Sequence, residues 1–362
     1  MGDMGEFATK SRIYLDHAAT TPVLPAAVAA MTAAMLQVGN PASVHAAGRA
    51  ANALLEQARD RVAAWAGVPA DRIVFTSGGT EALALAIHGA GIARFIASAT
   101  EHSAVLAARA DVIRAPVLAD GRIDLAALAL LLRDGPALVA VQQANNETGV
   151  IQPIPEVAAL VAAAGGRLLV DAVQAAGKLP LADADFITVS AHKLGGPPGV
   201  GVLIVRDPGQ LAAVQRGGGQ ERGLRGGTAN LPGIAGFAAA LDTPQDWTRL
   251  AALRDGLEAR LGAVVHGAAA PRLPHICNIG LPGVAGGTQV MALDLAGFMV
   301  SAGAACSSGK VAASHVLAAM GLGAAAGEAI RVSLGPQTTP AEVDAFADAW
   351  LAMAQRLGRR AA

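Results

Sequence analysis

The strongest constraint on the fold is an alternation of strand-like and helix-like segments that runs from residue 72 to about residue 206. Short apolar, β-branched runs such as 137–141 and 186–189 have the composition of buried strands. Glycine, proline or polar residues follow these runs and end them. Strands that alternate with helices form a mostly parallel sheet with helices on its faces. The sequence therefore predicts an α/β fold.

The pattern changes near residue 251, where a long helix is followed by weaker strands. The last helix is expected to begin near Pro340, because a periodic apolar pattern follows this residue. We therefore predict a large domain over 13–250, with a mostly parallel mixed sheet flanked by helices. Residues 1–12 and 251–362 would form a smaller α+β domain.

The overall composition excludes several classes of function. Hydrophobic residues make up 53% of the 362 residues and charged residues 15%, so we expect a large buried core rather than long disordered tracts. The formal net charge of −1 argues against nucleic acids and anionic membranes as partners. Neither a secretory leader pattern nor a long apolar run is visible, so we expect a soluble, cytoplasmic protein.

The two cysteines, Cys277 and Cys306, are too few for a disulfide framework or a four-thiolate metal site. Cys306 stands among small and polar residues and is a candidate reactive thiol, whereas Cys277 alternates with apolar residues and is expected in the core. The eight histidines show no spacing typical of zinc ligands, so no metal site is expected.

Polar residues follow two of the predicted strands. Lys193 lies just after a strand end, together with Ser190 and His192, and Asp171 ends the preceding strand. The carboxyl ends of strands are where open α/β sheets bind ligands. Lys193 could form a Schiff base with an aldehyde or simply open a surface loop. Asp171 could cap a helix or hold a cationic ring nitrogen.

Three further segments have two interpretations each. The glycine turn at 77–80 opens a helix, where it could bind phosphate or carry an ordinary helix cap at Thr80. His102 also opens a helix, and its ring could face a pocket or solvent. The glycine- and arginine-rich loop at 217–228 is typical of a functional or interface element, or of a disordered linker.

Ten motifs resemble, in their order along the chain, the fold-type I pyridoxal-phosphate enzymes of aminotransferase class V, and within these the cysteine desulfurases. The agreement extends over most of the chain, from residue 14 to residue 335. The motifs are YLDHAATTP (14–22), GNPAS (39–43), FTSGGTE (75–81), TEH (100–102), NNETG (145–149), VDAVQ (170–174), SAHK (190–193), GGGQERGLRGGT (217–228), SAGAAC (301–306) and IRVSLG (330–335).

The resemblance implies pyridoxal 5'-phosphate as the cofactor and assigns residues to it. Lys193 would carry the cofactor as a Schiff base and shuttle protons, and Asp171 would pair with the ring nitrogen. Gln174 would donate to the phenolic oxygen of the ring, and His102 would stack on the ring and take part in proton transfer. The residues implied around the phosphate are Gly79, Thr80, Ser190, His192 and, across a dimer interface, Thr228.

The resemblance also implies the substrate, L-cysteine, and the partners. Arg331 would bind the substrate carboxylate, assisted by Asn146 and Asn40. The thiolate of Cys306 would take the sulfur as a persulfide and leave L-alanine. A homodimer is implied, with an acceptor protein for the sulfur, either an iron–sulfur scaffold or a sulfur carrier for tRNA thiolation.

Other functions stay open at this point. A class V aminotransferase acting on another amino acid, or a selenocysteine lyase, would not require Cys306. A non-catalytic relative is a third alternative, although every expected catalytic residue is present. The segment between Gln174 and Ser190 is shorter than in housekeeping cysteine desulfurases, and the chain stops at Ala362 without their C-terminal extension. Both differences concern the identity of the sulfur acceptor.

Overall fold

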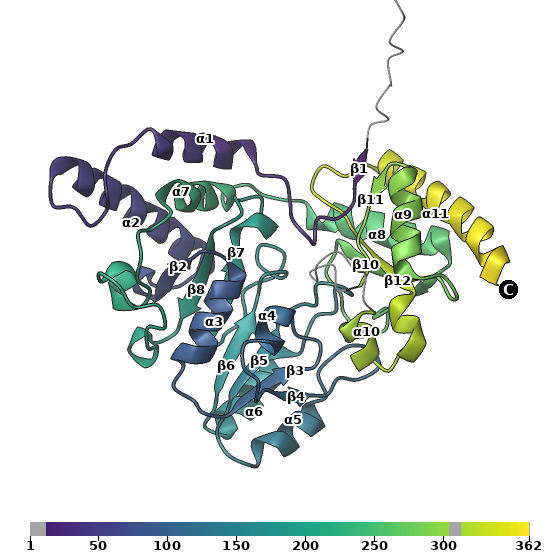
Figure 1. Cartoon of the computed structure of the whole chain (residues 1–362), viewed down its shortest axis with the longest axis horizontal. Helices are drawn as coiled ribbons and strands as arrows, with labels where there is room; N and C mark the ends of the chain where they lie inside the picture. The colour runs from purple at the N-terminus through teal and green to yellow at the C-terminus, as the bar shows by residue number, and fades with distance from the viewer. Residues whose placement is uncertain (1–11, 304–312, 362) are drawn as a thin grey trace, which may run out of the picture.

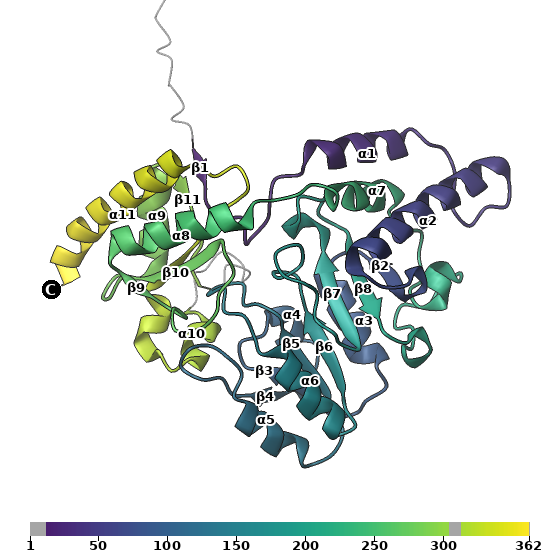
Figure 2. The same cartoon turned by 180° about the vertical axis from the view of Figure 1, so that it is seen from behind.

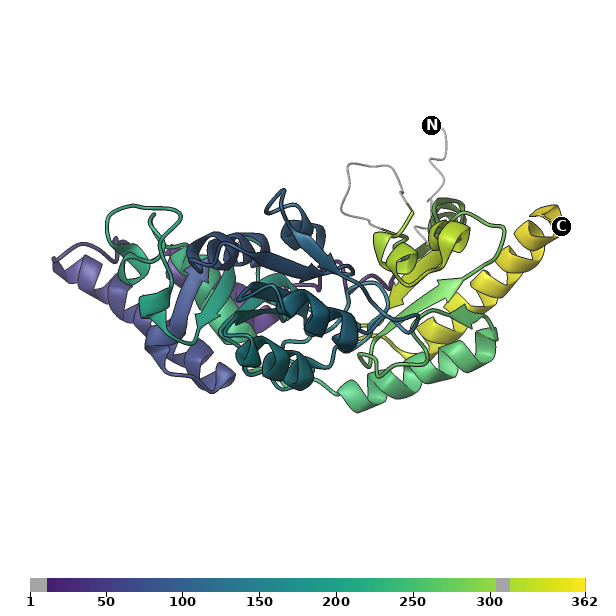
Figure 3. The same ribbon diagram turned by 90° about the horizontal axis from the view of Figure 1, so that it is seen from below.

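The computed structural model describes residues 12–303 and 313–361 of the chain. Figure 1 shows two bodies side by side, a larger one built mainly from the purple-to-green part of the chain and a smaller yellow-green one. Seen from below, the two bodies follow one another along the long axis of the molecule (Figure 3). Strand β1 (Ile13–Tyr14) belongs to the smaller body, although it begins the described chain.

A seven-stranded sheet forms the centre of the larger body. Strand β8 runs antiparallel to both of its neighbours, β2 and β7, and the remaining pairs are parallel. The predicted mostly parallel mixed sheet is therefore confirmed. In spatial order the strands are β2 (Ile73–Thr76), β8 (Gly201–Val205), β7 (Phe186–Ser190), β6 (Arg167–Asp171), β5 (Leu138–Gln142), β3 (Phe95–Ser98) and β4 (Ile113–Ala115).

Helices cover both faces of this sheet. In β5, Val139 and Val141 belong to one hydrophobic cluster and Leu138 and Ala140 to another, because successive side chains of a strand point to opposite faces. Helices α2, α5, α6 and α7 contribute to the first cluster, and α3 and α4 to the second. Figures 1 and 2 show α3 and α6 in front of the sheet from opposite sides. The helices of this body are α1 (Pro25–Met35, which packs on α7), α2 (Ala46–Ala66), α3 (Gly79–Gly89), α4 (Ser103–Leu106), α5 (Leu125–Leu132), α6 (Ile154–Ala163) and α7 (Leu231–Ala240).

The smaller body contains a three-stranded antiparallel sheet and a separate parallel strand pair. Its strands are β9 (Val264–Val265), β10 (Ile276–Gly280) and β12 (Ala329–Ser333), with β1 paired to β11 (Phe298–Met299). Its helices are α8 (Trp247–Leu261), α9 (Gly286–Leu295), α10 (His315–Ala319) and α11 (Pro340–Ala361). In the described part of the chain, no helix combines the length and the apolar character needed to span a membrane.

A single hydrophobic cluster joins α8, α9, α11 and strands β10, β11 and β12 of the smaller body. Cys277 lies in this cluster, as its position in a strand-like pattern predicts, and burial raises the pKa of its thiol to about 12. Leu15 packs in the same cluster, and Ile13 and Tyr14 pair with β11. The sequence places residues from 13 onward in the large domain, but residues 13–15 contact the smaller body. This pairing joins distant parts of the chain, which no local pattern reveals.

The loop at 217–228 is fixed to the larger body by Glu221. Its carboxylate accepts hydrogen bonds from Arg59 Nη1 (2.7 Å) and Nη2 (3.0 Å) and from the backbone N–H of Phe75 (2.8 Å). The two charged side chains are only 2% and 4% exposed, so removal of Arg59 would leave the charge of Glu221 buried without its partner. The loop is therefore an anchored element and not a disordered linker.

Candidate active site

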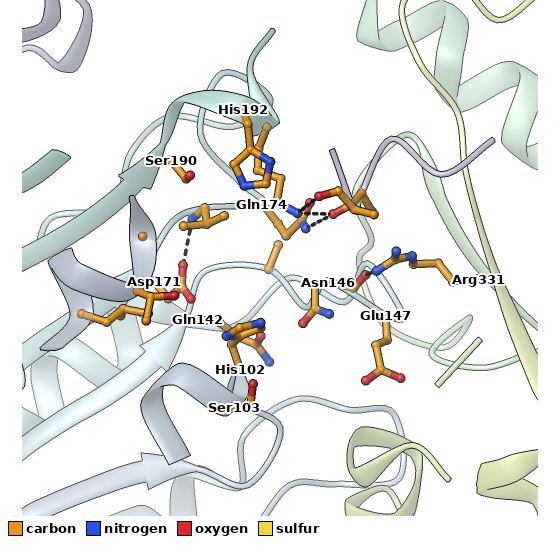
Figure 4. A pocket seen from close by; sticks show the side chains of 18 of the residues that line it. His102, Ser103, Gln142, Asn146, Glu147, Asp171, Gln174, Ser190, His192 and Arg331 are labelled. Carbon is orange, nitrogen blue, oxygen red and sulfur yellow. Dashed lines mark hydrogen bonds between the residues drawn. The ribbon is translucent and has the colours of Figure 1, made fainter. Parts of the chain in front are cut away.

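A cavity of about 510 Å³ lies where the two bodies meet, and residues of both bodies line it. Figure 4 shows the side chains that surround this space. Most of the site residues predicted from the sequence are brought together here. They are Gly79, Thr80, His102, Asn146, Asp171, Gln174, Ser190, His192, Lys193 and Arg331.

Strand geometry places the polar residues on the larger body's side of the cavity. Strands β6 and β7 are parallel neighbours, so Asp171 at the end of β6 and Ser190 at the end of β7 reach the same edge of the sheet. A short 3-10 turn (Ala191–Lys193) follows β7 directly and carries Lys193 to the cavity. Gln142 ends the neighbouring β5 and also lines the cavity.

The amine of Lys193 is held against the N-terminal segment of the chain. Its Nζ donates to the backbone oxygens of Ala18 (2.5 Å) and Ala19 (2.6 Å). Gln174 Nε2 donates to the same Ala18 oxygen (2.9 Å). Lys178 lies behind this group, with its Nζ 3.4 Å from the carbonyl oxygen of Lys193. Burial and the nearby charge of Lys193 lower the pKa of Lys178 to about 7.

Two buried carboxyl groups interact at the cavity, Asp171 in its wall and Glu101 outside it. Burial raises the pKa of Asp171, and the N–H of Val173 (2.9 Å from Oδ1) together with the charges of His102 and Lys193 partly offsets this shift. Burial and the charge of Asp171 raise the pKa of the fully buried Glu101 well above its usual value. Two like charges this close are costly, and cationic neighbours compensate only Asp171. We infer that Asp171 carries the negative charge and Glu101 the proton.

Two histidines of the site have defined contacts. His102 caps α4, and its Nδ1 accepts from the N–H of Ala104 (3.1 Å). His192 Nδ1 lies 3.1 Å from Thr20 Oγ1. Burial, and secondarily the charge of Lys193, lower the pKa of His192 to about 4, so its ring is neutral at pH 7. The neutral ring of His192 can therefore donate one hydrogen bond to a ligand without adding charge.

The start of α3 provides a place for an anionic group. Its N-cap, Gly78, has no side chain to bind the first N–H groups of the helix, and Gly79 and Thr80 in the first turn line the cavity. A Cβ added at Gly79 would lie 3.0 Å from Val173 Cγ2, so a larger residue would crowd this approach. An amine, a carboxylate and an anion-binding helix start in one cavity fit pyridoxal 5'-phosphate, the cofactor that the motifs imply.

Arg331 lies in the wall contributed by β12. Its Nη2 pairs with Asp16 Oδ1 (2.7 Å), and its Nη1 donates to the backbone oxygen of Asn146 (2.9 Å). The Nε atom is buried and has no hydrogen-bond partner among the described residues. N–H donors therefore remain for an anionic ligand, and a carboxylate matches the planar guanidinium.

Three predicted residues are not found at this cavity. Thr228 borders a separate cavity of about 60 Å³, next to Ser77 and Arg225. Asn40 is exposed, and its Oδ1 accepts from the N–H of Ala42 (2.9 Å) in a local turn. Cys306 lies outside the described residues. The roles predicted for these three residues stay predictions.

Sequence reasoning assigned no role to several acidic residues near the cavity. Glu147 lines it and accepts from Ser314 Oγ (2.6 Å), and the backbone oxygen of Glu101 lies 2.8 Å from His315 Nε2. Asp16 pairs with Arg331. All three acidic residues stand inside the motifs that carry the resemblance, where a charge in a mostly apolar chain is a usable signal for function. No group of three or more metal-ligating side chains occurs in the part of the chain that the structure describes.

Comparison with known proteins decides the family. The model of the aminotransferase class-V family matches residues 13–346. The chain belongs to this family. The resemblance inferred from the motifs is thus confirmed, and with it the expectation of an enzyme rather than a non-catalytic protein.

Curated members of the class-V family are similar over nearly their whole length. A protein named cysteine desulfurase from Cereibacter sphaeroides is 42% identical, with 92% of this chain and 93% of that protein aligned. An IscS-like cysteine desulfurase from Mycobacterium tuberculosis is 39% identical over the same shares, 92% and 93%. The solved structure of a NifS-like protein from Rickettsia africae superposes with a TM-score of 0.88 at 31% identity, covering 95% of this chain and 99% of that one.

Proposed function

We propose that this protein is a cysteine desulfurase, which removes sulfur from L-cysteine with pyridoxal 5'-phosphate as its cofactor. The observation that carries the proposal is the meeting of Lys193, Asp171 and Arg331 at one cavity in a member of the class-V family. The amine, the carboxylate and the guanidinium match the aldehyde of the cofactor, its ring nitrogen and the carboxylate of an amino acid. Relatives named cysteine desulfurase at about 40% identity support the choice of substrate.

The cofactor would lie between the strand ends and the start of α3. Pyridoxal 5'-phosphate supplies an aldehyde for amines and a ring that accepts electrons from a bound substrate. Lys193 would hold it through its amine, and Asp171 would keep the ring nitrogen protonated. His102 would stack on the ring. The phosphate would be bound by the N-terminus of α3 with Gly79, Thr80, Ser190 and His192.

The residues of the chain would divide the reaction between them. Arg331 would bind the substrate carboxylate through its remaining N–H groups, and the amine of Lys193 would move the proton at the substrate Cα. The thiolate of Cys306 would then attack the substrate sulfur. An S–S bond forms as the C–S bond breaks, and the electron pair of that bond stays with carbon, which takes up a proton to give L-alanine. The persulfide sulfur on Cys306 would pass to an acceptor protein.

A homodimer would complete the site. Thr228 and Asn40 lie away from the cavity of their own chain but on segments that a second copy could present to it. Exposed apolar side chains gather on α1 and the segment after it, where a partner would cover them. They are Val28, Met35, Leu36, Val38 and Val44, each at least half exposed.

The decisive experiment compares the purified wild-type holoenzyme with Cys306→Ala. The wild type should release L-alanine and sulfide from L-cysteine in the presence of a thiol reductant. The variant should keep the absorbance of the bound cofactor and lose this activity. Equal turnover by the variant would contradict the proposal and favour an aminotransferase or a selenocysteine lyase, neither of which needs this thiol.

A further inference from the structure

Asp16 is fixed beside the strand that carries Arg331. It follows β1 and forms a parallel bridge with Ser333, two residues beyond Arg331 in β12. The N–H of Ser333 donates to the oxygen of Leu15 (2.8 Å), and Ser333 Oγ accepts from the N–H of Ala18 (2.9 Å). The backbone on both sides of Asp16 is therefore anchored to β12.

The side chain of Asp16 is fixed at both of its oxygens. Oδ1 accepts from Arg331 Nη2 (2.7 Å), and Oδ2 accepts from Ser301 Oγ (2.7 Å). Ser301 is itself paired to Arg331, because its oxygen accepts from the Arg331 N–H at 2.7 Å and its N–H donates back at 3.2 Å. A carboxylate with two fixed donors cannot rotate without breaking one of these bonds. The fixed carboxylate of Asp16 therefore holds the guanidinium of Arg331 in one orientation.

The guanidinium held in this way is incompletely satisfied. The Arg331 side chain is 7% exposed and that of Asp16 17% exposed, so both charges are largely screened from water. Asp16 accepts one hydrogen bond from Nη2, and the backbone oxygen of Asn146 accepts one from Nη1. The Nε–H group has no acceptor among the described residues. A buried N–H without an acceptor costs free energy that a bound carboxylate would recover. Arg331 lines the cavity, whereas Asp16 does not.

We propose that Asp16 is a positioning residue for recognition of the substrate carboxylate, holding Arg331 so that its remaining N–H groups face the cavity. The inference rests on the proposed function, because it assumes an amino-acid substrate. Asp16 acts through Arg331 and touches neither substrate nor cofactor. The carboxylate is bound both before and during the reaction, so loss of Asp16 should raise KM and change kcat little.

The negative charge of Asp16 has an opposite effect, because it weakens the attraction between Arg331 and a second carboxylate. The two effects predict different signs when the side chain is removed. If positioning dominates, Asp16→Ala binds amino acids more weakly than the wild type. If the charge dominates, the same variant binds them more tightly.

The test is calorimetric titration of the holoenzyme with L-alanine, the reaction product, which requires no turnover. Ethylamine, which lacks the carboxylate, is the matched ligand. Asp16→Ala should lose about 10- to 100-fold in affinity for L-alanine and lose nothing for ethylamine. Asp16→Asn keeps an oxygen that can accept from Nη2 and should retain most of the wild-type affinity. Asp344→Asn, which alters an exposed pair with Arg260, is the control variant.

Equal or tighter binding of L-alanine by Asp16→Ala would overturn the proposal, and so would an equal loss of affinity for ethylamine. Should the Ala variant fail to fold, Asp16→Glu keeps the charge and moves the carboxylate by one methylene. That variant should then bind L-alanine more weakly, and unchanged binding would overturn the proposal. A wild-type holoenzyme that binds L-alanine but releases no sulfide from L-cysteine would contradict the proposed function. It would not contradict the positioning role of Asp16.

Discussion

The cavity has two walls with different origins (Figure 4). The strand-end wall consists of Asp171, Ser190 and Lys193, which follow neighbouring strands of one sheet. The arginine wall consists of Arg331 and Asn146, and Asp16 holds Arg331 from outside the cavity. The three residues come from distant segments of the chain. The first wall would bind the cofactor and move protons, and the second would bind the substrate carboxylate. We therefore expect that chemistry and recognition can be changed separately.

The largest effect is expected in the strand-end wall. Lys193→Ala removes the amine that would move the proton at the substrate Cα, so turnover of L-cysteine should fall by at least about 10³-fold. Binding of L-alanine should weaken far less, because the arginine wall is unchanged. Steady-state release of alanine and calorimetric titration measure the two quantities. Similar losses in both would mean that the two walls do not act separately.

In the arginine wall we expect a smaller effect, which lowers the affinity for L-alanine and leaves cofactor binding unchanged. Arg331→Lys keeps the charge but loses the planar fork, and affinity for L-alanine should fall about 10- to 100-fold, or about 1.5–3 kcal/mol. The absorbance of the bound cofactor should not change. Arg260→Lys, at an exposed pair with Asp344, is the control. Loss of cofactor absorbance in Arg331→Lys would contradict the expectation that this wall binds the substrate independently of the cofactor.

The stability of the folded chain should be sensitive to acid through His17, the residue after Asp16. Burial lowers the pKa of His17, which follows Asp16, to about 4, below its usual 6.5. Above pH 6.5 the ring is neutral in folded and unfolded chains, and its full contribution to stability is present. As the pH falls from 6.5 toward 4, only the unfolded chain takes up the proton, so stability is lost. Between pH 7 and pH 5 the free energy of unfolding should drop by about 2 kcal/mol from this group.

Chemical denaturation at both pH values measures this drop, and His17→Asn should reduce it by the same amount. The buried His275 also has a pKa lowered well below the usual value by burial and contributes in the same direction. A stability drop that is equal in His17→Asn and wild type would contradict the assignment.

The smallest effect is expected at the start of α3. Gly79→Ala places a Cβ 3.0 Å from Val173 Cγ2, so the side chain of Val173 must give way slightly. Affinity for pyridoxal 5'-phosphate should fall only a few-fold, and affinity for L-alanine in the loaded enzyme should not change. Equilibrium dialysis of the apoenzyme measures the first quantity. An unchanged cofactor affinity would place the phosphate away from this helix.

The two walls also differ in how well the sequence predicts them. The mixed sheet and the strand-end wall follow from local patterns, because a polar residue directly after a buried strand lies at the sheet edge. Arg331 could be assigned only through the family resemblance. Its contact with Asp16 joins residues 315 positions apart, and no periodicity or spacing encodes such a pairing.

Pairings of this long-range kind explain the other differences as well. Strand β1 pairs with the distant strand β11, so residues 13–15 pack on the smaller body and not in the predicted large domain. The pKa of Glu101 is raised by its burial and by the charge of Asp171, and the burial of an acidic side chain is not visible in a local pattern. In each case the deciding contact joins residues that are far apart in the sequence and meet only in the folded chain.

The most direct test of the account is the mass of the intact protein after incubation with L-cysteine in the absence of a reductant. The wild type should gain the mass of one sulfur atom on Cys306, and L-alanine should appear in the solution. Lys193→Ala should gain none. Release of L-alanine by the wild type without any sulfur added to Cys306 would contradict the account.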